Sequence, residues 1–239
     1  MHLPPTAVSH GPPLNTCAWT LMDYDTDIES VLTAISRSYR PQSSGAAVAL
    51  TLSVGIECLA LHLSLSTRAD GADSHEYHTD LRGRIDGWRE AAQGAFLEDP
   101  VHVGDVIDAR RARRMGPEGG SMENAQRELD ALQQANAVLL RLMEVSLALE
   151  NDASEMLRGR GVAHARAEAA TAMHLAEAAT RSVTSMLVTN VATARERAAD
   201  FDVLPIDVRA LEEIVKRIPD EEARMRLGRA LATLDSVSR

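Results

Sequence analysis

The stretch AAVALTLSVGIECLALHLSL, residues 46–65, is the longest apolar run in the chain and largely decides its fold. It carries Glu57 and several hydroxyl side chains, and basic or aromatic residues do not flank both ends at the depth that a membrane span uses. We therefore predict a central helix over 46–66, buried on nearly all sides. The turn-rich loop before it ends in Ser43 and Ser44, either of which is expected to cap the helix.

Apolar residues recur at helical spacing along most of the remaining chain. Residues 1–24 are Pro-rich and are expected to form an arm, and residues 25–239 are predicted to form a single helical domain. Ala, Ser and Gly are abundant on the inner faces, so we predict an all-α helical bundle with long central helices that forms a homodimer. The predicted helices cover 25–38, 79–97, 103–114, 121–157 (capped by Ser121 and ended by the RGRG run 158–161), 162–199, 206–217 and a last helix that begins at Pro219.

The composition excludes several classes of protein. The 239 residues include only two cysteines, too few for a disulfide framework. A net charge of -10 and 3% aromatic residues argue against a nucleic-acid binder or a protein held on an anionic membrane. The first residues lack the basic start and apolar core of a secretory signal. We expect a cytoplasmic protein that acts on a small molecule, with neither nucleic acid nor membrane as a partner.

Three stretches resemble the cyclodeaminase/cyclohydrolase family, the helical folate-processing domain of formiminotransferase-cyclodeaminase and of methenyltetrahydrofolate cyclohydrolases. PQSSGAAVAL, residues 41–50, is similar to the family's Pro-Gly-Gly-Gly-Ser loop and the small-residue helix that follows it. LALENDASEM, residues 147–156, is similar to its Asp-x-Asp-Ala-x-Ala-Phe segment. AEAA at 176–179 and IPDEE at 218–222 match its Ala-Glu-x-Ala helix and terminal Ile-x-Asp-Glu. These stretches leave 68–120 as an insert without a recognised counterpart.

The resemblance implies an all-helical homodimer with a folate bound near the glycine loop and a catalytic carboxylate. It places Ser43, Ser44 and Gly45 in substrate binding, and Asp152 and Glu150 in catalysis. Only one of the family's three loop glycines is kept, and the family's Asn-Pro-Asn loop is not recognisable. We therefore expect either a tetrahydrofolate derivative or a non-folate molecule as substrate, without a required cofactor or metal.

The chemistry needs one well-placed carboxylate. Opening a methenyl bridge, or closing one with loss of ammonia, requires a base that later serves as an acid. Asp152 is the first choice, and Glu150 lies about 200° away around the helix, so the two should not face one substrate. Glu57 in the apolar helix could hold a substrate amine, although an ion pair with an Arg of another helix is the favoured alternative.

Each of the other polar groups has both a functional and a structural interpretation. The run Arg110–Arg114 could grip a polyanion or pair with acids of the chain itself. Cys58 with His62, and the group Asp73, His75, His78 and Asp80, have metal-ligand chemistry, but a core histidine and a solvated loop are favoured. Most aromatic residues lie in the arm or the insert, so the insert is expected to supply any stacking partner of a flat ligand.

Two functions remain open. The first is a divergent enzyme that adds water or an amine at an imine-like C–N centre in a specialised pathway. The second is a catalytically inactive helical dimer that serves as a binding or assembly module. A ligand-sized polar pocket containing Asp152 favours the enzyme, because a module would fill that space with apolar side chains.

Overall fold

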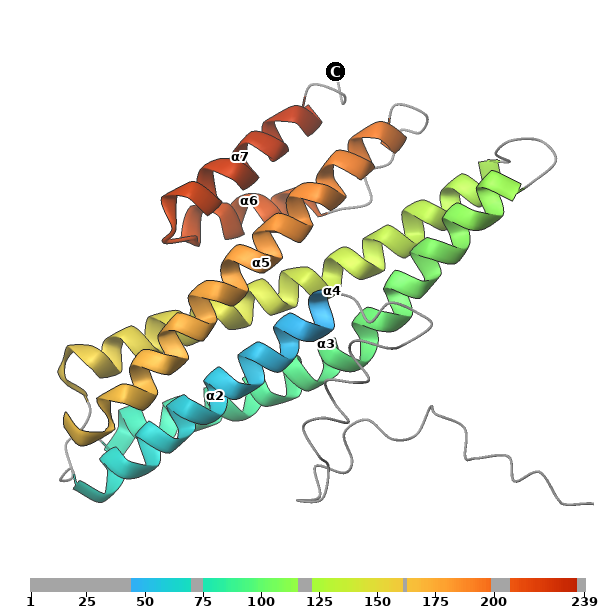
Figure 1. The fold of residues 1–239 in the computed structure, drawn as a ribbon. Helices are drawn as coiled ribbons and strands as arrows, with labels where there is room; N and C mark the ends of the chain where they lie inside the picture. Colours follow the sequence, from blue (N-terminus) through green and yellow to red (C-terminus); the bar gives the residue numbers. More distant parts are fainter. Residues whose placement is uncertain (1–43, 70–74, 116–121, 161–162, 199–206, 236–239) are drawn as a thin grey trace, which may run out of the picture.

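Six α-helices make up most of the computed structural model, which describes residues 44–69, 75–115, 122–160, 163–198 and 207–235 (Figure 1). These residues contain no strand, so the predicted all-α fold is confirmed. The arm 1–24, the helix predicted over 25–38, Ser43 and Ser121 lie outside the described residues. The helices are α2 (Ser44–Ala69), α3 (His75–Met115), α4 (Met122–Glu155), α5 (Arg166–Ala198), α6 (Val208–Arg217) and α7 (Glu221–Asp235), with a π-helical turn η2 (Met156–Arg160) and a 3-10 turn η3 (Ala163–Ala165).

Helices α2 to α5 form an antiparallel four-helix bundle. Each packs on the next, and α5 closes the bundle on α2, while α7 packs on α5 and α6 lies between α7 and α4. Small residues allow the close approach: Ala172, Ala176 and Ala179 are fully buried on the inner face of α5. A side chain at Gly55 of α2 would contact Leu149 and α5, so glycine lets these helices meet there. The predicted insert contains α3, one of the four bundle helices.

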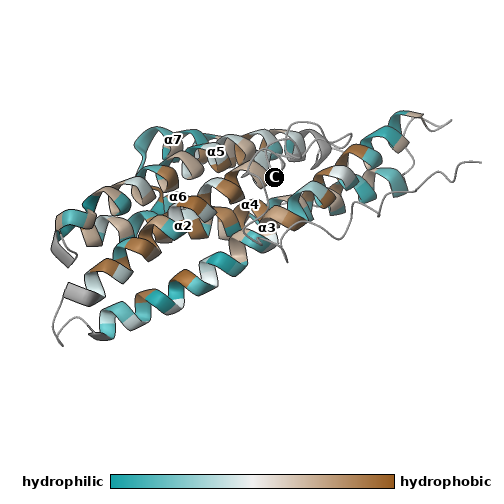
Figure 2. Ribbon diagram, turned by 60° about the horizontal axis from the view of Figure 1, so that its bottom comes forward, coloured by the Kyte–Doolittle hydropathy of each residue, from teal (hydrophilic) through white to brown (hydrophobic). Residues whose placement is uncertain are grey.

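Helix α2 is half buried, which corrects the expectation of burial on nearly all sides. Its inner face is buried at Leu52, Ile56 and Leu59, whereas Val54 and Leu61 on its outer face are about half exposed, at 51% and 50%. Figure 2 shows α2 as a strongly hydrophobic helix beside the mainly hydrophilic first half of α3. By length and composition alone it could cross a membrane, and half of that apolar window is buried within the bundle.

Helix α3 is continuous, so the prediction of separate helices over 79–97 and 103–114 is wrong. Pro100 lies inside it, where a proline removes one backbone donor and usually ends a helix. Packing outweighs this cost, because Ile85, Trp88, Ala92 and Phe96 bury one face of α3 before the proline.

The helix ends also differ from the prediction. The first three residues of the RGRG run belong to the π-helical turn over 156–160 that follows α4, and Gly161 lies outside the described residues. Pro219 lies before its helix, and Asp220 caps α7 by accepting a hydrogen bond of 2.8 Å from the Ala223 N–H. Asp207 caps α6 in the same way, with 2.9 Å to the Ala210 N–H.

Candidate functional site

The predicted site residues line three separate cavities. Ser44 and Gly45 lie at the N-terminus of α2, and Glu57 lies on the outer face of that helix. Glu150 and Asp152 lie in a cleft formed by α4 with parts of α3, α5 and α6. The structure therefore does not bring the predicted substrate loop and the predicted catalytic carboxylates together within one chain.

Asp152 lies in a polar cleft of 890 Å³ near the C-terminal end of α4. Its side chain is 10% exposed, and both carboxylate oxygens accept hydrogen bonds from Arg84 of α3, at 2.9 and 3.1 Å. This bidentate pair fixes the orientation of the carboxylate. The π-helical turn begins at Met156, four residues after Asp152, and such turns are frequent at functional sites.

Glu150 lines the same cleft as Asp152. Their spacing separates them by about 200° around α4, yet both residues line this cleft. The pKa of Glu150 is raised by burial and by the nearby carboxylates of Glu177 and Asp220. The cleft therefore combines a carboxylate held by an Arg with one whose pKa is raised.

The second cavity contains a buried acid that the sequence analysis missed. Asp99 of α3 is 2% exposed, and its Oδ2 accepts a hydrogen bond of 3.0 Å from the Ala46 N–H. The Gly45 N–H also donates to this carboxylate, so Asp99 caps the first turn of α2. Burial raises the pKa of Asp99 to about 6, although the two backbone hydrogen bonds lower it.

Gly45 is required by this close approach. A Cβ atom at position 45 would lie less than 3.0 Å from the carboxylate atoms of Asp99, closer than real Cβ atoms come. The one glycine that the chain keeps from the family's loop thus makes room for an acid. The cavity has a volume of 520 Å³ and is lined by Ser44, Gly45, Asp99, Val103, Ala135, Leu139, Ser185, Met186, Thr189 and Asn190.

Two signals could have pointed to Asp99. The separate helices predicted over 79–97 and 103–114 leave Glu98, Asp99 and Pro100 in the segment between them. An acid in such a connecting segment is expected to lie in solvent. A continuous helix instead carries it into the bundle. The retained Gly45 was the other signal, because a single kept glycine indicates that another group approaches the backbone there.

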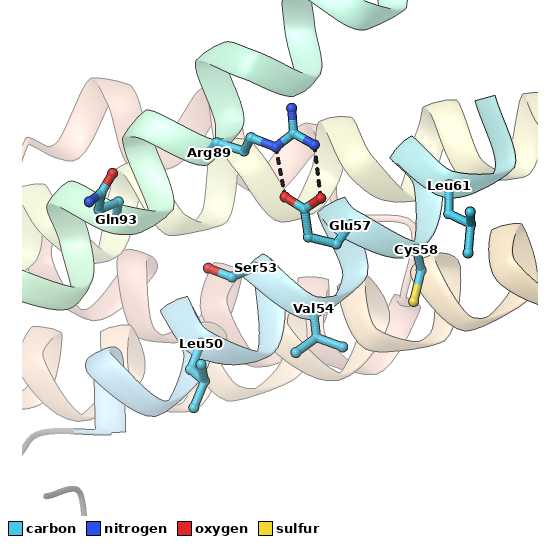
Figure 3. Close-up of a pocket in the computed structure, with 8 residues that line it drawn as sticks. All are labelled: Leu50, Ser53, Val54, Glu57, Cys58, Leu61, Arg89 and Gln93. Atoms are coloured by element: carbon cyan, nitrogen blue, oxygen red, sulfur yellow. Dashed lines mark hydrogen bonds and ion pairs between the residues drawn. The ribbon is translucent and has the colours of Figure 1, made fainter. Parts of the chain in front are cut away.

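Glu57 lies in a third cavity, an apolar groove of 560 Å³ between α2 and α3 (Figure 3). Its carboxylate forms a bidentate pair with Arg89 of α3, with distances of 2.7 and 2.8 Å. This is the ion pair that was the favoured alternative. The groove also contains Cys58, whose pKa is raised by burial and by the carboxylates of Glu168 and Glu57.

The remaining polar groups pair within the chain. Arg110 and Arg113 of the basic run contact the fully buried Glu128 of α4, at 2.9 and 3.2 Å. His62 is buried, and its Nδ1 contacts the backbone oxygen of Ala165. Among the residues whose positions are given, no group of three or more His, Cys, Asp or Glu side chains could hold a metal ion.

Among the described residues, the aromatic side chains of the predicted insert do not line the three cavities, and their stacking on a flat ligand stays a prediction. Trp88 and Phe96 of α3 are each only 8% exposed and belong to the core. No aromatic residue occurs among the described residues that line the three cavities. A flat ligand would therefore contact aliphatic and polar side chains there.

Comparison with known proteins identifies the family of the chain. The model of the formiminotransferase-cyclodeaminase family matches residues 27–202, which is most of the chain and includes helices α2 to α5. No curated protein matches the chain. The matched range includes Gly45, Asp99, Glu150 and Asp152.

Proposed function

The chain belongs to the formiminotransferase-cyclodeaminase family, and we propose that it is a divergent enzyme that adds water or an amine to an imine-like carbon. One observation carries the proposal: Asp152 lies in a polar cleft of 890 Å³. A module that only assembles would gain stability by filling such a space with apolar side chains. Ligand cavities of enzymes commonly have volumes in this range.

Asp152 acts as base and then as acid. As the oxygen of water attacks the C=N carbon, its proton passes to the Asp152 carboxylate. The C–N bond then breaks as the same proton passes to the leaving nitrogen, which restores the carboxylate, and the carbinol oxygen loses its remaining proton to solvent as the C=O bond forms. When an amine attacks instead, its proton takes the same route and ammonia leaves.

Arg84 positions the Asp152 carboxylate for this role. It donates one hydrogen bond to each oxygen, and each carboxylate oxygen has a second lone pair that can accept a proton from the substrate. Glu150 lines the same cleft, and burial together with the carboxylates of Glu177 and Asp220 raises its pKa above the ordinary value.

The substrate is a tetrahydrofolate derivative or a non-folate molecule with the same reacting group. Ser43, Ser44, Gly45 and Glu57 lie outside the Asp152 cleft or beyond the described residues, so substrate contacts in the cleft come from its own lining. The enzyme is a cytoplasmic homodimer that needs neither a cofactor nor a metal. The half-exposed apolar face of α2 is available for the second copy.

The test measures turnover of methenyl- and formimino-tetrahydrofolate, followed by a panel of non-folate amidines and imines. For any substrate that is turned over, Asp152→Asn should lower kcat by about 100-fold or more, as expected for loss of a general acid–base group. The matched control is Asp86→Asn, which removes an exposed carboxylate from a different Arg pair on α3. This control should leave kcat unchanged.

A normal rate in Asp152→Asn overturns the role of Asp152. The Arg84→Gln variant separates positioning from catalysis, because it keeps the carboxylate and should lower kcat less than Asp152→Asn. If no compound is turned over and none raises the melting temperature, the alternative of an inactive dimer for binding or assembly is favoured.

A further inference from the structure

We propose that the cavity at the N-terminus of α2 binds a small organic cation, with an amidinium, guanidinium or primary ammonium group against Asp99. This site is separate from the Asp152 cleft and does not depend on the chemistry proposed there. Three features carry the inference: an acid without a cationic side chain beside it, a lining rich in hydrogen-bond acceptors, and an apolar wall.

The first feature is the isolation of the acid. Asp99 is 2% exposed, and none of the described residues that line its cavity is Arg, Lys or His. Its neighbours on α3 are engaged elsewhere, since Glu98 pairs with Arg141 of α4 and His102 lies 4.0 Å from Asp105. Two backbone N–H groups hold the carboxylate, but they carry only the partial charge of a helix terminus. A buried carboxylate in this setting either takes up a proton or pairs with a cation.

The second feature is the supply of acceptors. The hydroxyl hydrogens of Ser185 and Thr189 are used within α5, donated to the backbone oxygens of Arg181 and Ser185 at 3.1 and 3.0 Å. Their oxygen lone pairs remain as acceptors. Asn190 uses its amide Nδ2 on the Oδ1 of Asn136 at 2.7 Å, so its own oxygen is a further acceptor. Together with Asp99, these groups match a ligand that is rich in N–H donors.

The third feature distinguishes an organic cation from a metal ion. Val103, Leu139 and Met186 form an apolar part of the lining, and the cavity volume of 520 Å³ exceeds the need of a single ion. Calcium and magnesium sites normally use several carboxylates, whereas only one carboxylate is present among the described lining residues. A ligand with a charged nitrogen head and a carbon body fits both parts of the cavity.

The test titrates the full-length protein with benzamidine by calorimetry at about pH 8, where Asp99 is ionised. Benzamide and benzoate have nearly the same shape but lack the cationic group. We expect benzamidine to bind at least about ten-fold more tightly than either, because charge-assisted hydrogen bonds are much stronger than neutral ones. Lowering the pH to about 5 should weaken benzamidine binding by a similar factor as Asp99 takes up a proton.

Two variants locate the site. Asp99→Asn keeps an oxygen for the Ala46 N–H and should weaken benzamidine binding at least about ten-fold. Asp86→Asn should leave this binding unchanged, because its exposed carboxylate pairs with Arg89 and does not line this cavity. Thr189→Val removes one acceptor and should weaken binding about three-fold. Its control, Thr193→Val, changes a threonine of α5 that has the same internal hydrogen bond but does not line the cavity.

Several results would overturn the proposal. These are equal binding of benzamidine and benzamide, unchanged binding in Asp99→Asn, or loss of binding in Asp86→Asn. No binding of benzamidine, guanidine or n-butylamine would show that Asp99 serves only as a cap of α2. Binding of calcium or magnesium chloride alone, lost in Asp99→Asn, would replace the organic cation with a metal ion.

Discussion

Asp99 and Asp152 are both more than nine-tenths buried on helices of one bundle, yet they are held in different ways. Asp152 receives two hydrogen bonds from the guanidinium of Arg84, a full positive charge. Asp99 receives only backbone N–H groups from the first turn of α2. The difference shows that this fold can bury an acid either with a side-chain cation or with a helix terminus.

The two arrangements serve different chemistry. An Arg keeps a carboxylate oriented and charged, which suits a group that accepts a proton from an attacking nucleophile. A helix terminus supplies weaker compensation, and burial raises the pKa of Asp99 to about 6. Asp99 therefore changes its charge near neutral pH, and any ligand paired with it must itself supply positive charge.

The largest expected effect is on the pH dependence of stability. In the folded chain the pKa of Asp99 is about 6, above its ordinary value of 3.8, so the folded state binds a proton more tightly than the unfolded state. The contribution of Asp99 to stability is therefore full below about pH 4 and is lost as the pH rises through 6. We expect a loss of up to about 3 kcal/mol across this interval, measured by urea unfolding.

Asp99→Asn separates this effect from that of other groups, including His102 and Glu98 on the same helix. The difference in the free energy of unfolding between wild type and variant should change with pH between about pH 4 and pH 7. Outside that interval it should stay constant. Parallel stability curves would show that the charge of Asp99 is fully compensated, and the contrast with Asp152 would then disappear.

The next prediction concerns the room that Gly45 leaves for Asp99. Gly45→Ala places a methyl group where the carboxylate lies, and we expect it to destabilise the fold by about 1–3 kcal/mol. The matched control is Gly83→Ala on α3, where a new Cβ has no neighbour within 4 Å. That change should stabilise the helix by about 0.5–1 kcal/mol, because alanine favours helix. Urea midpoints that move in the same direction in both variants would contradict the close approach of Asp99.

The helical bundle and the position of the Asp152 segment could be predicted from the sequence. Apolar residues at helical spacing identified α4 and α5, and the matched Asp-Ala segment located the acid in the cleft. The continuity of α3 was not predictable from local signals, because Pro100 normally ends a helix and only packing on α2 and α4 overrides it. Asp99 was missed for the same reason: its burial depends on a helix that crosses the proline.

The smallest effects concern the two bidentate Arg–carboxylate pairs of α3. Arg84–Asp152 and Arg89–Glu57 have nearly the same hydrogen-bond distances, between 2.7 and 3.1 Å. Their exposure differs, because the side chain of Asp152 is 10% exposed and that of Glu57 is 61% exposed. Double-mutant cycles with Arg→Met and acid→amide changes should give a coupling of about 1–2 kcal/mol for the first pair. For the second, water screens the charges and we expect about 0.2–1 kcal/mol.

The dependence of the two coupling energies on salt concentration gives a stricter test. At about 1 M salt the screening length falls to about 3 Å, so the exposed Arg89–Glu57 coupling should decrease markedly while the Arg84–Asp152 coupling decreases less. Equal couplings, or an equal loss in salt, would mean that water enters the Asp152 cleft as freely as it reaches Glu57. Arg84 would then not hold Asp152 apart from solvent, and the cleft would lose the feature that distinguishes its carboxylate from a surface acid.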